Sequence, residues 1–167
     1  MQINLLYHYA WSCIWLIVPV LLFNVLLMGR LPEIYQPKFF TYGIPSWISA
    51  GENTFRVLIF VLPLLMPLDI ERSGQRIGLA AYLAGVTLYS LSWAMQIWFP
   101  QSRWSASRWG FMAPSYTPLL WLTGIAFIGD SLFLPIPYIR WIYVWLSIIF
   151  LCFHNLHTWI VYSRTAN

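Results

Sequence analysis

Residues 138–162, with the sequence YIRWIYVWLSIIFLCFHNLHTWIVY, decide the class of this protein. The stretch is apolar and aromatic along its whole length, and Arg140 is its single Asp, Glu, Lys or Arg residue. A helix rises about 1.5 Å per residue, so about 20 apolar residues cross the hydrocarbon core of a bilayer. The stretch therefore predicts a membrane-spanning helix.

The composition of the whole chain supports the same class. Of its 167 residues, 60% are hydrophobic and 8% are charged, whereas a soluble domain is roughly 45–50% apolar and about 25% charged. Aromatic residues make up 19%, and such rings suit the boundary between membrane and water. The basic residues are scattered singly rather than clustered, which argues against nucleic-acid binding. We therefore expect an integral membrane protein in contact with membrane lipids.

Four more apolar segments precede this stretch, and the five together predict the architecture. The predicted spans are residues 9–28, 46–68, 77–99, 114–134 and 138–162. We expect an all-α membrane protein with a single transmembrane domain over residues 1–167, built as a bundle of five helices. The second segment is ambiguous, because its apolar half, residues 57–68, is too short to span and contains Pro63 and Pro67, which kink or end helices. If it is only re-entrant or interfacial, four spans remain.

Five spans place the two chain ends on opposite faces of the membrane. The face of the N-terminus then receives Arg72, Arg76 and Arg140, and the other face receives Arg30, Lys38, Arg103, Arg108 and Arg164. Basic residues favour the cytoplasmic side. The sequence therefore predicts a protein of the bacterial cytoplasmic membrane with a cytoplasmic C-terminus.

Polar side chains from four of the five predicted helices fall at one level, near the face of the C-terminus. These candidate ligand-binding residues are Glu52, Arg56, His154, His157, Asn24 and Gln96. Glu52 and Arg56 are four residues apart, so they share a helix face. His154 and His157 are three apart and share one too. Because ionisable groups at membrane depth usually face protein or a cavity, we expect this level to hold a polar headgroup or to move a proton.

Plainer interpretations of the same residues remain open. Glu52 and Arg56 form an ordinary ion pair at a helix end in one, and the two histidines are hydrogen-bonded interfacial residues in another. A metal is not predicted, because His-x-x-His supplies too few ligands. The cofactor is unknown; a haem would need His8 beside His157, which a four-span topology allows and a five-span topology does not.

Three functions fit these observations. The first is a binding protein for a lipid-like or planar hydrophobic ligand, in which Arg56 contacts an anionic group, the histidines donate hydrogen bonds, and Trp93, Tyr89 and Trp159 form walls. The second is an accessory subunit of a larger membrane complex, with pigments or cofactors among its partners. The third is a proton-transfer enzyme acting on a lipid, with His154 or Glu52 as base.

In size, predicted helix number and tryptophan content, the chain resembles the tryptophan-rich sensory proteins, small five-helix membrane proteins that bind porphyrins and sterols. The resemblance is one of composition, since that family's first-loop and third-helix motifs do not align with residues 31–45 or 92–98. Glu52 with His154 is also similar to the acid and histidine chemistry of small five-helix sterol isomerases. The first resemblance implies a planar hydrophobic ligand, and the second implies proton transfer.

Overall fold

The computed structural model describes residues 10–165, and these residues are organised as helices. Their elements are α2 (Ile14–Leu27), η1 (Met28–Arg30), η2 (Glu33–Tyr35), α3 (Pro37–Phe40), α4 (Ser46–Val61), η3 (Leu62–Leu65), α5 (Ser73–Trp98), α6 (Arg103–Ala106), α7 (Arg108–Tyr116), α8 (Pro118–Ile128) and α9 (Arg140–Thr165). The described part contains no β-strand beyond an isolated bridge between Ser12 and Pro67. The predicted all-α class is confirmed.

Four helices of the described part are long and apolar enough to cross a membrane, compared with the five predicted. They are Ser46–Leu65, Ser73–Trp98, Arg108–Ile128 and Arg140–Thr165. The ambiguous second segment is therefore one of the long helices. The first segment is the short one, since its helix Ile14–Arg30 extends only about 25 Å at 1.5 Å per residue.

The first helix starts late because the chain before it pairs with the chain after η3. Cys13 N donates to Met66 O at 2.8 Å, and Leu68 N donates to Trp11 O at 2.8 Å. These bonds take the place of helical ones at residues 11–13, where residues 9–28 were expected to be helical. Tyr9, where the predicted span begins, lies outside the described residues.

The other helix ends differ from the predicted ones where turn and cap residues decide. The third helix begins at Ser73 rather than residue 77, because the Gln75 side chain accepts from Arg72 N at 3.0 Å and caps it. The fourth predicted segment starts at Arg108 rather than residue 114, because Ser107 caps α7 by accepting from Gly110 N at 3.1 Å. It also ends at Ile128 rather than residue 134.

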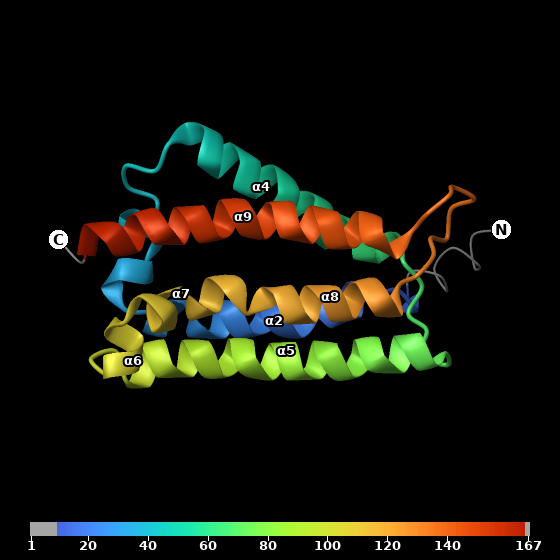
Figure 1. Ribbon diagram of the computed structural model, residues 1–167, viewed down its shortest axis with the longest axis horizontal. Coiled ribbons are helices and arrows are strands. Elements are labelled where there is room, and N and C mark those ends of the chain that lie inside the picture. The colour runs from blue at the N-terminus through green and yellow to red at the C-terminus, as the bar shows by residue number, and fades with distance from the viewer. Residues whose placement is uncertain (1–9, 166–167) are drawn as a thin grey trace.

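The long helices run alternately between the two ends of an elongated bundle (Figure 1). α4 and α9 lie together on one side, α5 lies on the other, and α7, α8 and α2 are between them in this view. α8 packs against both α5 and α9. Tyr82 of α5 donates its hydroxyl to Leu16 O of α2 at 2.8 Å, which ties α2 to the bundle.

Glycines allow the backbones of α5 and α8 to touch. A Cβ atom on Gly124 would lie 2.5 Å from Tyr82 N and 2.6 Å from Gly78 O. Gly85 faces the backbone of Trp121 in the same interface. Small residues permit such close packing of helices in lipid, and the spacing of Ala81 and Gly85 predicts a packing face here. In the structure Gly78 and Gly85 contact α8, and Ala81 is half-buried.

Candidate functional site

The carboxylate of Glu52 lies at the centre of a polar cluster between α4 and α9. Glu52 is 3% exposed, and its Oε1 accepts a hydrogen bond from Arg56 one helical turn later. The same oxygen is 2.9 Å from His154 Nδ1, and Oε2 is 2.6 Å from His157 Nδ1. We name Glu52, Arg56, His154 and His157 the carboxylate cluster. The structure thus brings together four of the six predicted site residues.

The close approach of α4 to α9 has a local cause in the sequence. Gly51 precedes Glu52, and a Cβ atom there would lie 2.5 Å from ring atoms of Phe153. Because glycine has no Cβ, the Phe153 ring packs directly on the α4 backbone. This contact brings the residues that flank it in sequence, Glu52 and His154, within hydrogen-bonding distance.

His157 also connects the cluster to residues 31–45, the connecting segment between α2 and α4. Its Nε2 donates to Phe40 O at 2.9 Å, and the Phe40 ring stacks on the imidazole with centroids 4.5 Å apart. Tyr35 of the same segment donates its hydroxyl to Phe111 O at 2.9 Å, and burial raises the pKa of this phenol. Arg164 donates to Tyr42 O. These contacts fold the connecting segment onto the helices.

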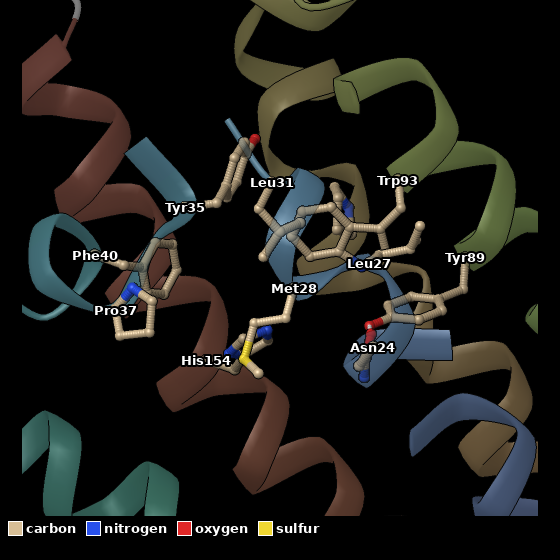
Figure 2. A pocket seen from close by; sticks show the side chains of 11 residues that line it. Asn24, Leu27, Met28, Leu31, Tyr35, Pro37, Phe40, Tyr89, Trp93 and His154 are labelled. Atoms are coloured by element: carbon tan, nitrogen blue, oxygen red, sulfur yellow. Dashed lines mark hydrogen bonds between the residues drawn. The ribbon is translucent and has the colours of Figure 1, made fainter. Parts of the chain in front are cut away.

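Two adjoining cavities lie beside the cluster. The first has a volume of about 280 Å³, and Figure 2 shows side chains of α2, α5, α9 and the connecting segment around it. The second has a volume of about 290 Å³, and Arg56, Phe60, Trp121 and Phe150 are in its wall. Both cavities are lined by Asn24, Tyr89, Pro114 and His154. His154 therefore belongs to the polar cluster and to the wall of both cavities.

Asn24 lies across the cavities from the cluster. Its Oδ1 accepts from the Tyr89 hydroxyl at 2.6 Å, a contact visible in Figure 2. Its amide nitrogen makes no hydrogen bond to another described residue, so it is available to a ligand in either cavity. Asn24 was predicted for this level, and the structure places it on a shared wall rather than in the cluster.

Gln96 lies apart from this site. Its Nε2 donates to Gly110 O at 2.7 Å, which joins α5 to α7, and it lines neither of the two cavities. Of the expected walls, Trp93 and Tyr89 line the first cavity, whereas Trp159 packs under the Arg108 guanidinium, 4.1 Å from its ring centroid. Gln96 and Trp159 therefore have structural contacts elsewhere.

Sequence reasoning did not single out Trp121, which is 3% exposed and lines the second cavity. Its Nε1 is buried and makes no hydrogen bond in the described part of the chain. An unsatisfied buried donor costs about 1–3 kcal/mol. The nearby glycines at positions 78, 85 and 124 were the available signal, because they bring α8 and its indole against α5.

The remaining charged contacts lie at the opposite end of the bundle. Asp130 is 2.9 Å from Arg72 and 3.8 Å from Arg140. Residues 10–165 contain no group of three or more His, Cys, Asp or Glu side chains arranged to hold a metal. His8, on which the haem hypothesis depends, lies outside the described residues.

Comparison with protein-family models, with curated proteins and with solved structures found no match to this chain. No relative therefore supplies a role for the residues of the cluster or the cavities.

Proposed function

We propose that this protein is an integral membrane protein that binds a lipid-like ligand, with the headgroup at the carboxylate cluster and the apolar body in the adjoining cavities. The observation that carries the proposal is that Arg56 and His154, two members of the carboxylate cluster, also line aromatic cavities. Binding sites for small molecules commonly combine a mostly apolar concave wall with a few oriented polar groups.

The outer surface supports residence in a membrane. Large apolar side chains point outward along α2 and the long helices, with exposures of 74% for Leu26, 66% for Ile77 and 62% for Trp145. In water such surfaces would drive aggregation, whereas lipid tails would cover them. The end of the bundle that carries α6 and the end of α9 also has the larger number of basic residues, so we assign it to the cytoplasmic side.

Tryptophan fluorescence tests this proposal, because Trp93 and Trp121 are in the cavity walls. The purified protein in detergent is titrated with single-chain C18 amphiphiles brominated in mid-chain, and each titration is repeated with an excess of the unbrominated compound. We expect at least one probe to quench saturably and to be displaced by its unbrominated form. Quenching of outward-facing tryptophans by probe dissolved in the micelle would not saturate.

Matched variants locate the bound probe. Trp121→Phe should remove part of the saturable quenching, and Trp145→Phe, which changes an outward ring, should remove none of it. Leu27→Phe partly fills the first cavity and should weaken binding, whereas Leu26→Phe on the outward face should not. Equal effects of Leu27→Phe and Leu26→Phe would place the ligand outside the cavities and refute the proposal.

A second candidate function is proton transfer, because His154 has the geometry of a histidine held by a carboxylate. Its Nδ1 contacts Glu52, and its Nε2 makes no hydrogen bond to a described residue. The His154 side chain also lines both cavities. In such pairs the carboxylate orients the ring so that Nε2 acts as base and acid. A proton taken by Nε2 from a substrate carbon next to a double bond would return at another carbon, which isomerises the substrate.

Deuterium exchange distinguishes this enzyme from a binding protein. The protein is incubated in D₂O with a lipid extract of the membranes that express it, and the lipids are analysed by mass spectrometry. Catalytic incorporation of deuterium that disappears in His154→Gln, a variant that keeps a donor toward Glu52, would establish proton transfer. Saturable probe binding without incorporation would support the binding protein alone.

A further inference from the structure

The hydrogen bonds of the carboxylate cluster determine how many protons it holds. His157 Nε2 faces Phe40 O at 2.9 Å, and a carbonyl oxygen can only accept, so this nitrogen carries a proton. His157 Nδ1 and Glu52 Oε2 are 2.6 Å apart, and His154 Nδ1 and Glu52 Oε1 are 2.9 Å apart. Each of these contacts needs one proton between its two atoms, because two lone pairs repel at such distances.

With no proton on His154 Nε2, which has no hydrogen-bond partner among the described residues, these three protons make the group of Glu52, His154 and His157 electrically neutral. A carboxylate with two neutral imidazoles holds two protons and carries one negative charge, so a third proton brings the charge to zero. This result is the same whether a shared proton is assigned to the carboxyl oxygen or to the ring nitrogen. The negative charge of Glu52 is therefore already balanced by the histidines.

The guanidinium of Arg56 is then left as a net positive charge at the cavity wall. Its other described contacts are neutral, namely Asn53 Oδ1 at 3.0 Å and the Phe150 ring at 5.8 Å. Glu52 is the sole described carboxylate within ion-pair distance of it. Its side chain is 39% exposed, and Arg56 is in the lining of the second cavity beside Phe60, Trp121 and Phe150.

We propose that the ligand is an amphiphile with a single negative charge, whose anionic group contacts Arg56 and whose chain lies between the aromatic walls. This inference rests on the proposed function and adds the charge of the ligand to it. An uncompensated charge beside an apolar cavity is unfavourable, and a monoanion neutralises it. The Asn24 amide provides a further donor toward an acceptor group. Free alkyl acids and lipids with a monoanionic phosphodiester share this chemistry.

A headgroup series tests the inference with one brominated C18 chain. The probes carry a sulfonate, a carboxylate, a phosphodiester of glycerol, a hydroxyl or a trimethylammonium group, and binding is measured by saturable tryptophan quenching. A charge-assisted hydrogen bond contributes about 1.5–3 kcal/mol, so we expect the sulfonate to bind at least about tenfold more tightly than the alcohol. The relative affinities of carboxylate and phosphodiester distinguish a free acid from a lipid headgroup.

Variants at two arginines show whether the preference comes from this site. In Arg56→Gln the ratio of sulfonate to alcohol affinity should fall to near one, and in Arg56→Lys it should largely persist. Arg103→Gln removes an exposed arginine that lines neither cavity and should leave the ratio unchanged. Equal affinity for sulfonate and alcohol in the unmodified protein, or a preference for the cation, would overturn the inference while the binding function stands. Absence of saturable binding by every probe would overturn both.

Discussion

The proton count of the carboxylate cluster predicts that two substitutions of Glu52 have very different effects. In Glu52→Gln, the amide oxygen can accept from Arg56 and His154, as Oε1 does now. The amide nitrogen can donate to His157 Nδ1, which leaves that ring neutral and its Nε2–H still directed at Phe40 O. All hydrogen bonds of the cluster are retained, so we expect the free energy of unfolding to fall by less than about 1 kcal/mol.

Glu52→Ala removes the common acceptor, and its cost follows from the hydrogen bonds that this acceptor makes. The two bonds to α9 connect different helices, and each contributes about 1–2 kcal/mol when charge-assisted and shielded from water. The bond to Arg56 is within α4 and adds little, because the guanidinium keeps its contacts with Asn53 and the Phe150 ring. We therefore expect the free energy of unfolding to fall by about 2–4 kcal/mol.

Unfolding by SDS in mixed micelles, followed by far-UV circular dichroism, measures these changes. Glu71→Ala is the matched control, because Glu71 is an exposed acid outside the helices and its loss should change stability by less than about 0.5 kcal/mol. If Glu52→Gln is as damaging as Glu52→Ala, the negative charge itself is needed and the neutral assignment is wrong. A Glu52→Ala protein as stable as the control would show that the hydrogen bonds of the cluster do not form.

Three further outcomes follow from packing and charge elsewhere in the chain. Gly124→Val should lower the free energy of unfolding by about 3 kcal/mol or more, because its Cβ meets backbone atoms. Gly29→Ala is the control and should change the free energy of unfolding little, because Gly29 has open space around it. Similar losses for both variants would contradict the α5–α8 contact. Asp130→Asn should cost at most about 1 kcal/mol, and the difference should shrink in high salt, since its nearer partner, Arg72, is 72% exposed. A salt-independent loss would argue against ion pairing. A lipid-soluble maleimide should label Cys152 in the folded protein and Cys13 only after unfolding. Intact-mass measurement after timed quenching measures the labelling, and equal labelling rates of the two cysteines would contradict the burial of Cys13.

The sequence alone was sufficient to predict the all-α class and which side chains share a helix face. Long apolar runs predict helices of spanning length, and the spacing within a helix determines which side chains share a face. Glu52 and Arg56 share a helix face as expected, and so do His154 and His157; the packing of α4 on α9 brings the two pairs together.

The tertiary structure decided which of these residues touch and what surrounds them. The rotation of one helix against another depends on packing, such as Phe153 on Gly51, and no period in the sequence specifies it. This packing made Glu52 the common partner of both histidines, and directed Gln96 to Gly110 instead. Folding of the connecting segment onto His157 is likewise a long-range contact. The sequence thus determined the position of the polar groups along each helix, because that position follows from helix rise, and the tertiary packing determined their pairing, charge balance and cavities.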